Sequence, residues 1–377
     1  MGYRYCVFGA GRQGVAAIYD LVKFCDADWV VVYEPNEKSR RRAHERLSDL
    51  LKDDYYKVLF VSTLDDRRTP LIEWESFDVM ISCAPWKANL ELTEFAMRRK
   101  TPFCDLGGNP DTVGKQESLK PDTPVVPDCG LSPGISNILA VYLAEKGCDE
   151  IKVRCGGIPL TRFNDGLNYR LTFDPMGLIS EYSGDVPVII NGLIRLIPAL
   201  SILEPYSAVC ECSPTSNNSP QVVESLLELG VLNYDYMTIR YKGHWELVHG
   251  WKAIGFLSGN KEMDLHLAEA LSKNPELQYD PNKHVDKVIL SITGKAAIDR
   301  VTEDNMKVTK GFEFEVFADP DTKFSAMELM TSWGITMVAH YMATHPGNVP
   351  YKFVTPERFV PGKWIMDEIQ KREGSPG

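Results

Sequence analysis

Two short segments of the sequence place an acidic side chain or a thiol where an apolar run ends. Asp105 begins Asp-Leu-Gly-Gly-Asn, and Asp128 and Cys129 lie in Pro-Asp-Cys-Gly, before Gly130. A carboxylate beside a reacting nitrogen can anchor an ammonium group or accept its proton. We therefore predict Asp105, Asp128 and Cys129 as catalytic candidates and Gly130 as a substrate contact. The sequence leaves open which carboxylate is the base and whether either one only caps a turn. It favours Cys129 as a small buried residue over a nucleophile.

A glycine-rich motif lies close to the start of the sequence. Gly9, Gly11 and Gly14 have the spacing G-x-G-x-x-G, after an apolar run and before a segment with helical periodicity. In that setting the first glycine makes a tight turn, the second lets a pyrophosphate approach, and the third lets helix and strand pack. The helix N-terminus would stabilise the phosphate charge. The motif predicts a dinucleotide-binding site that includes Arg12 and Gln13.

An acidic residue closes the second apolar run, Trp29–Tyr33, about 20 positions beyond the last glycine of the motif. A carboxylate at this place, here Glu34, accepts hydrogen bonds from an adenosine ribose and would repel a 2′-phosphate. The predicted cofactor is therefore NAD. The run Arg40–Arg42 could reverse this preference, but we interpret it as the solvated face of a helix.

Two further runs end in residues that suit a cofactor contact. Ser82, Ala84 and Pro85 follow one run, and Gly107 follows the next. Ligands of doubly wound sheets bind outside the carboxyl ends of the strands. We predict that these four residues contact the cofactor near its nicotinamide.

Two arginines could hold a substrate carboxylate, which arginine binds well through its paired donors. Arg240 and Arg170 are the candidates, with an ordinary surface position as the alternative for each. Arg240 alternates with Ile239 along an expected strand and should project to one face. His244 follows a glycine and could shuttle protons, because a histidine pKa lies near neutrality. His244 and His249 share no helical face, so we predict no metal site.

The elements that position these residues fall into two groups. Apolar runs alternate with helical segments over about the first 130 residues, as in a parallel sheet covered on both faces. The expected strands there are Tyr3–Gly9, Trp29–Tyr33, Val58–Val61, Phe77–Ser82, Pro102–Asp105 and Pro124–Pro127. After an expected helix over Ile135–Lys146, strands with few helices between them indicate an α+β domain with a mixed or antiparallel sheet. Those strands are Ile151–Cys155, Asn168–Phe173, Val186–Ile190, Tyr236–Tyr241, Val285–Ile292 and Phe312–Phe317. Helical periodicity returns over Phe324–Thr344 and from Lys363.

The composition restricts the possible partners. The 377 residues include 41 basic and 52 acidic side chains, a net charge of −11, which argues against nucleic-acid binding. Nine scattered cysteines without a Cys-x-x-Cys pair suit a reducing compartment. The first residues leave no room for a signal peptide, and no apolar run reaches the ~18 residues of a membrane span. We expect a cytoplasmic protein without nucleic-acid or membrane partners.

Several stretches resemble the saccharopine dehydrogenase-like family, and lysine 6-dehydrogenases in particular. They are DLGGN, VVPDCGLSPGISNILA, CGGIP, TIRYKGH and, after a Met-rich helix, TPERFVPG. The resemblance implies a discontinuous Rossmann domain over residues 1–134 and 323–377. It also implies a substrate-binding domain over residues 135–322 that commonly pairs subunits, and hence a homodimer or higher homo-oligomer.

The same resemblance implies NAD-dependent oxidation of an amino-acid amine. The reaction it suggests first is oxidative deamination of the lysine side chain to the 6-semialdehyde, with release of ammonia and NADH. Saccharopine-forming members usually carry PNRDS where this sequence reads Pro214-Thr215-Ser216-Asn217-Asn218. The missing arginine counts against a dicarboxylic adduct. The alternatives are a saccharopine- or carboxyspermidine-type enzyme acting on a secondary amine, and a non-catalytic NAD-binding redox sensor.

Overall fold

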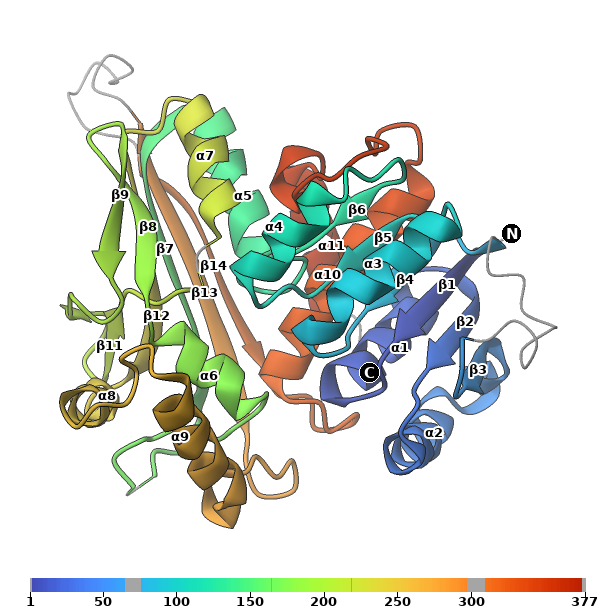
Figure 1. The fold of residues 1–377 in the computed structure, drawn as a ribbon, viewed down its shortest axis with the longest axis horizontal. Coiled ribbons are helices and arrows are strands. Elements are labelled where there is room, and N and C mark those ends of the chain that lie inside the picture. Colours follow the sequence, from blue (N-terminus) through green and yellow to red (C-terminus); the bar gives the residue numbers. More distant parts are fainter. Residues whose placement is uncertain (1, 65–75, 164, 218, 297–308, 375–377) are drawn as a thin grey trace. The chain divides into compact units, whose positions relative to one another are not determined.

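The chain folds into two compact units, shown in the computed structural model of Figure 1. The first unit contains Met1–Ile138 and Glu328–Gly377, and the second contains Leu139–Met327. The sequence analysis places the corresponding boundaries after residues 134 and 322. The structure describes residues 2–64, 76–163, 165–217, 219–296 and 309–374.

The first unit contains a six-stranded sheet in the order β3-β2-β1-β4-β5-β6 (Figure 1). Its strands are β1 (Tyr3–Phe8), β2 (Ala27–Tyr33), β3 (Val58–Val61), β4 (Val79–Ser82), β5 (Phe103–Asp105) and β6 (Val125–Val126). Every pairing is parallel. This is the doubly wound order, in which the chain reverses direction across the sheet between β1 and β4. The predicted Rossmann-type fold is confirmed.

Helices cover both faces of this sheet. They are α1 (Arg12–Phe24), α2 (Glu37–Leu51), α3 (Asn89–Arg98), α4 (Pro110–Ser118), the first residues of α5 (Ile135–Glu145), most of α10 (Ala326–Thr344), and α11 (Gly362–Glu373). Leu92 and Phe95 of α3 pack with Phe8 and Phe103 in one buried cluster. Tyr5 points to the face of the sheet opposite to Phe8. Its hydroxyl forms a hydrogen bond with His340 Nδ1 of α10 at 3.2 Å. The sheet residues are therefore apolar on both faces.

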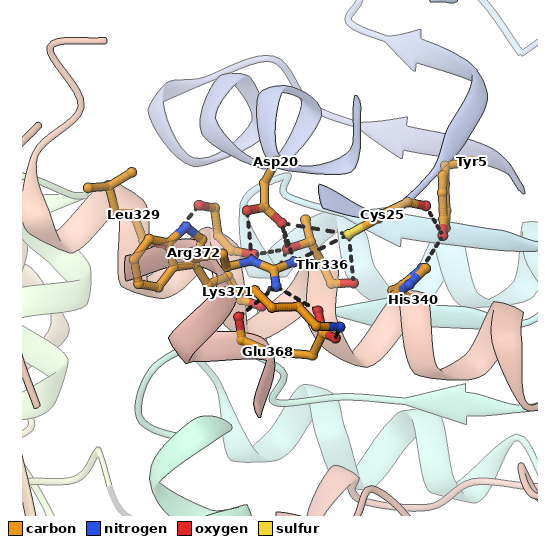
Figure 2. Close-up of polar contacts among 11 residues, drawn as sticks. Tyr5, Asp20, Cys25, Leu329, Thr336, His340, Glu368, Lys371 and Arg372 are labelled. Carbon is orange, nitrogen blue, oxygen red and sulfur yellow. Dashed lines mark hydrogen bonds and ion pairs between the residues drawn. The ribbon is translucent and has the colours of Figure 1, made fainter. Parts of the chain in front are cut away.

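A buried ion network joins the two ends of the sequence within the first unit. Figure 2 shows Arg372 of α11 between Asp20 of α1 and Glu368. Its Nε and Nη2 donate to Asp20 Oδ1 and Oδ2 at 2.9 and 2.8 Å, and its Nη1 donates to Glu368 Oε2 at 2.9 Å. Thr336 of α10 also donates to Asp20. The network fixes α11 and α10 against the helix that follows the glycine motif.

The second unit contains an eight-stranded mixed sheet. Its strands are β7 (Cys148–Pro159), β8 (Asp185–Ile190), β9 (Leu193–Pro198), β10 (Glu204–Pro205), β11 (Cys210–Ser213), β12 (Asn233–Tyr241), β13 (Asp286–Ala296) and β14 (Thr309–Phe317). The order is β10-β11-β12-β7-β13-β14, with the β8–β9 hairpin attached to β12. β12 and β7 pair in parallel, and their other neighbours are antiparallel. The predicted mixed sheet is confirmed.

Two expectations for the second unit are wrong. Helices do interrupt its strands, namely α6 (Pro175–Glu181), α7 (Pro220–Glu228), α8 (His244–Ala253) and α9 (Lys261–Lys273). Asn168–Phe173 forms no strand, and only Leu171 makes an isolated bridge, with Gln278. The apolar residues of this segment, Tyr169 and Leu171, instead fill the core under the helices, beside Trp245 of α8. The alternating apolar residues that predicted a strand are therefore buried against helices instead.

Candidate active site

The glycine motif forms a tight turn between β1 and α1. Gly9 has φ +94, and a Cβ on it would lie 3.0 Å from the Ala84 nitrogen after β4. A Cβ on Gly14 would lie 2.1 Å from the Gly9 carbonyl oxygen. A Cβ on Gly11 would meet no described atom within 4 Å. The first and third glycines therefore serve close packing, and the space beside the second one is open to a ligand.

The start of α1 is suited to an anion. Gly11 is its N-cap and supplies no side chain to bond the first N–H groups, and the first turn contains no acidic residue. The helix dipole and these N–H groups favour a negative charge. Arg12 is exposed at this end, whereas Gln13 Oε1 is buried without a hydrogen-bond partner among the described residues. The loop, with its open space at Gly11, fits the pyrophosphate of a dinucleotide.

Glu34 lies just beyond the end of β2. Its Oε2 accepts a hydrogen bond from the Ala10 N–H at 3.0 Å, and its Oε1 accepts one from the Asn36 N–H at 2.9 Å. The carboxylate is thus held between the glycine turn and the start of α2. A carboxylate oxygen has more than one acceptor site, so both can still accept ribose hydroxyls.

The three arginines after Glu34 have different positions. Arg40 folds back and donates from Nη1 to the Glu34 carbonyl oxygen at 2.8 Å. Arg41 pairs with Glu45 on an exposed surface, and Arg42 bonds a carbonyl within its own helix. The interpretation as a solvated face therefore holds for Arg41 and Arg42, while Arg40 lies beside the expected ribose position.

The end of β4 is organised by Ser82. Its buried hydroxyl donates to Asn89 Oδ1 at 2.8 Å and accepts from the Ala84 N–H at 3.4 Å. Ser82 thereby holds the loop that places Ala84 against Gly9. Pro85 follows in the same loop, before a short 3-10 turn over Trp86–Ala88.

Asp105, at the end of β5, is fully buried and has both carboxylate oxygens occupied. Oδ1 accepts from the Gly107 N–H at 2.7 Å, and Oδ2 accepts from Gln116 Nε2 at 2.6 Å. Its carbonyl oxygen accepts from the Cys129 N–H at 2.9 Å. Burial raises the pKa of Asp105 to about 6. This geometry favours a supporting role, and Gln116 is a member of the cluster that the sequence analysis missed.

Asp128 is held differently. It adopts a left-handed backbone with φ +60, which aspartate tolerates better than most residues. A Cβ on Gly107 would lie 1.9 Å from Asp128 Oδ1, so glycine is required there for the close approach. Burial, then the charge of Asp105, then that of Glu357, raise the pKa of Asp128 to about 8. The geometry therefore favours Asp128 as the group that exchanges protons.

Cys129 and Gly130 build the turn that follows. The Cys129 side chain is fully buried, donates to the Val126 carbonyl oxygen at 3.3 Å, and has a pKa that burial raises well above its ordinary value. Such a thiol is inert, which agrees with its interpretation as a small buried residue. Gly130 packs against α10, where a Cβ on Gly334 would lie 2.2 Å from the Gly130 oxygen.

In the second unit, Arg240 lies on a polar face of β12. Its side chain is 4% exposed, and its Nη2 lies 3.6 Å from Glu181 Oε2. Nε donates to the Tyr182 hydroxyl at 3.3 Å, and the guanidinium lies 4.8 Å from the centre of the Tyr169 ring. Arg240 is thus a buried cation held in position by α6 and by a stacked ring.

Glu181 is the second residue that the sequence analysis missed. Its Oε2 is buried, without a hydrogen-bond partner among the described atoms and with only the long ion pair to Arg240. Burial raises its pKa to about 7, against the opposing effect of Arg240. A fixed cation and a fixed carboxylate therefore lie side by side in this unit.

His244 does not have the near-neutral pKa expected from the sequence. It is fully buried, with Nδ1 at 2.6 Å from the Leu167 carbonyl oxygen and Nε2 at 2.9 Å from the Tyr182 hydroxyl. Burial, with a further effect of Arg240, lowers its pKa to about 3. A neutral imidazole with both nitrogens engaged can orient Tyr182 and hence Arg240. This environment favours a positioning role for His244 over the expected proton shuttle.

Arg170 also has partners within the second unit. Its Nη1 donates to Asp165 Oδ2 at 2.5 Å, and its guanidinium stacks on Phe163 at 3.3 Å. Its buried Nε has no hydrogen-bond partner among the described residues and belongs to the lining of a small cavity with Thr172 and Tyr279. Arg170 is therefore a buried residue whose partners lie in its own loop, and it is not an ordinary surface arginine.

Two absences concern only the described part of the chain. No group of three His, Cys, Asp or Glu side chains there could hold a metal ion. No helix in the same residues has both the length and the apolar character to cross a membrane.

Comparisons with known proteins agree with this architecture. The model of the Saccharopine dehydrogenase C-terminal domain family matches residues 130–375, more than half of the chain. The fold is similar to that of saccharopine dehydrogenase (L-Glu forming) from Saccharomyces cerevisiae, with a TM-score of 0.69 and 16% identity over 99% of this chain and 98% of that one. A myo-inositol dehydrogenase from Corynebacterium glutamicum is also similar, at a TM-score of 0.40 and 10% identity over 100% of both chains.

Proposed function

Because the chain belongs to the Saccharopine dehydrogenase C-terminal domain family, we propose that it is an NAD(P)-dependent oxidoreductase acting on an amine of an amino acid. The observation that carries the proposal lies in the first unit. A glycine turn with an open space at Gly11 and a buried aspartate, Asp128, both follow strands at the carboxyl edge of one parallel sheet. That edge is where doubly wound sheets bind their ligands.

The residues at this edge divide the chemistry between them. A bound nicotinamide cofactor would supply a hydride acceptor for the carbon that carries the amine. Gly11 and the start of α1 bind its pyrophosphate, and Asp105 and Ser82 hold the loops in place. Asp128 takes one proton from the substrate ammonium, because only the neutral amine can release a hydride and become an iminium ion. Water then adds to the iminium carbon, and ammonia leaves.

The second unit supports an amino-acid substrate. Arg240 suits a substrate carboxylate, and Glu181 beside it suits an ammonium group. Together they match the charged head of an α-amino acid. We propose L-lysine, whose second amine would be the one oxidised to the semialdehyde. The alternative of a secondary-amine substrate remains weaker because Pro214–Asn217 lacks an arginine.

The nucleotide preference that we propose is NAD. Glu34 presents a carboxylate at the expected ribose position, and this charge would repel a 2′-phosphate. Arg40 lies next to it, with its guanidinium bonded to the Glu34 carbonyl oxygen. A redox sensor would need the same nucleotide site, yet it would have no use for a buried carboxylate with a pKa of about 8.

The experiment that tests the proposal is a substrate panel. NADH or NADPH formation is followed by absorbance with L-lysine, other amino acids, polyamines and saccharopine, each with NAD and with NADP. We expect turnover with L-lysine and NAD, with ammonia released in equal amount to NADH. Turnover only with saccharopine would support the secondary-amine alternative, and nucleotide binding without turnover on any amine would support the sensor.

Arg240→Met should raise the KM for the amino acid by about 10²-fold, the cost of removing one charged partner of a buried carboxylate. Cofactor affinity should be unchanged, because Arg240 is not part of the glycine turn or of the Glu34 site. Arg240→Lys keeps the charge but loses the paired donors, so its KM should lie between those of the parent and of Arg240→Met. Arg162→Met changes an exposed arginine of the same unit and serves as the control. A parent-like KM for Arg240→Met would remove Arg240 from the substrate site.

We also propose that the chain forms a homodimer through β9. This strand exposes Leu193, Ile194 and Leu196 by 54%, 42% and 65%, and it pairs only with β8 in the described residues. An apolar strand with a free edge pairs readily with a copy of itself, and a two-fold axis makes the two edges complementary. Leu196→Asp should give monomers in analytical ultracentrifugation. Leu265→Asp, at a position of α9 that is 48% exposed, should not. A monomeric parent protein would refute the dimer.

A further inference from the structure

A segment near the C-terminal end of the sequence runs beside β6 in the first unit. The Val125 N–H donates to the Lys352 carbonyl oxygen at 3.2 Å, and its own carbonyl oxygen accepts from the Val354 N–H at 3.0 Å. Val125 and Phe353 form a parallel bridge. The segment therefore extends the edge of the parallel sheet.

Two acidic residues that are distant in sequence follow this pairing. Asp128 lies three positions after Val125, and Glu357 lies four positions after Phe353, the residue that bridges Val125. Because β6 and the paired segment run parallel, both residues lie toward the carboxyl edge of the sheet. Glu357 is 5% exposed, and Thr355 Oγ1 donates to its Oε1 at 2.6 Å. A buried carboxylate therefore follows the segment that pairs with β6.

The charged groups that act on the pKa of Asp128 are of one sign. Asp105 acts on it from β5 and Glu357 from the C-terminal segment, while the Gly108 N–H donates to it from the loop after β5. The neighbouring thiol of Cys129 is held in its neutral form by burial. No basic side chain in the described residues contributes to the shift of the Asp128 pKa. Like charges close to a carboxylate disfavour its ionised form.

We propose that Glu357 is a positioning residue that acts through Asp128. Its charge adds to the effects of burial and of Asp105 in keeping Asp128 protonated, and so raises the pH above which Asp128 can accept a proton from an ammonium substrate. The inference rests on the proposed function for the identity of that proton donor. It names a residue of the reaction that no sequence motif assigned, since TPERFVPG is 229 positions away from the aspartate that Glu357 controls.

Glu357→Gln isolates the charge, because glutamine keeps the size and the oxygen that accepts from Thr355. The protein is labelled with ¹³C-aspartate, and the Asp128 carboxyl signal is identified by its absence in Asp128→Asn. Its titration is then followed by NMR in the parent and the variants, without substrate or turnover. The parent midpoint should lie at about 8. In Glu357→Gln it should fall by on the order of one pH unit.

Two variants control for structure and for charge elsewhere. Glu357→Asp keeps the charge and should keep the raised midpoint, and Glu94→Gln removes an exposed carboxylate of α3 and should change nothing. The acidic limb of the pH–kcat/KM profile should move with the NMR midpoint. An unchanged Asp128 midpoint in a folded Glu357→Gln protein would overturn the inference. A shifted midpoint in a protein that turns over no amine would leave the inference standing and refute the proposed function.

Discussion

Asp128→Asn should lower kcat/KM for the amine by ~10²–10⁴-fold, the range typical of losing a general base. Asparagine keeps the size of the side chain and can occupy the contact with Gly107, but it cannot accept a proton at neutral pH. NAD affinity should be close to that of the parent, because the glycine turn does not involve this residue. Steady-state kinetics and separate cofactor titrations measure the two effects.

Asp105→Asn is the matched control for this substitution. Both carboxylate oxygens of Asp105 accept hydrogen bonds from protein groups. The substitution should therefore act through the loop that Asp105 holds. An amide cannot accept from both Gly107 and Gln116 in the same way, and the variant should lose stability as well as rate. A larger pure rate loss in Asp105→Asn, with parent-like activity in Asp128→Asn, would exchange the two roles.

The stability of the protein gives an independent readout of the Asp128 pKa. The folded-state value, about 8, is above the ordinary value of 3.8. Stability from this group is therefore complete below pH 3.8, declines as the pH rises, and is lost above about 8. Asparagine removes this dependence. The melting temperature of Asp128→Asn minus that of the parent should increase between pH 5 and pH 9. A difference that stays constant over this range would show that the pKa of Asp128 is ordinary.

Arg372→Met should destabilise the first unit by ~3–5 kcal/mol, because it leaves Asp20 and Glu368 as buried charges without their partner. The Arg372 side chain is 0% exposed, and its Nε and Nη2 connect α11 to Asp20 of α1 (Figure 2). For a unit of this size the loss corresponds to a fall in melting temperature of about 10 °C. Thermal and urea unfolding measure it.

An exposed ion pair on α11 is the control for Arg372→Met. Lys363 and Asp367 are four residues apart, as Glu368 and Arg372 are, but their side chains are 72% and 51% exposed. Lys363→Met should cost less than ~1 kcal/mol, since water and salt screen an exposed pair. Asp20→Asn added to Arg372→Met should restore part of the loss by removing one unpaired charge. Equal effects of the two single substitutions would show that burial does not set the strength of the network.

The sequence by itself determined the features that depend on local backbone geometry. Gly9 and Gly14 were predictable as parts of a tight turn between β1 and α1 because the need for close packing acts over a few residues. Glu34 was predictable because β2 ends where its apolar run ends. The parallel sheet followed from apolar runs buried on both faces, and the mixed sheet followed from the change in pattern after residue 135.

Only the tertiary structure decided which polar groups carry charge and which are already engaged. Asp105 and Asp128 look equivalent in sequence, yet only Asp105 has an amide partner on α4. Only the pKa of Asp128 is raised by the charge of Glu357, which follows a distant segment paired with Val125. His244 looks like an ordinary histidine until its burial is known. The physical reason is that protonation depends on desolvation and neighbouring charge, which arise from contacts between residues far apart in the chain.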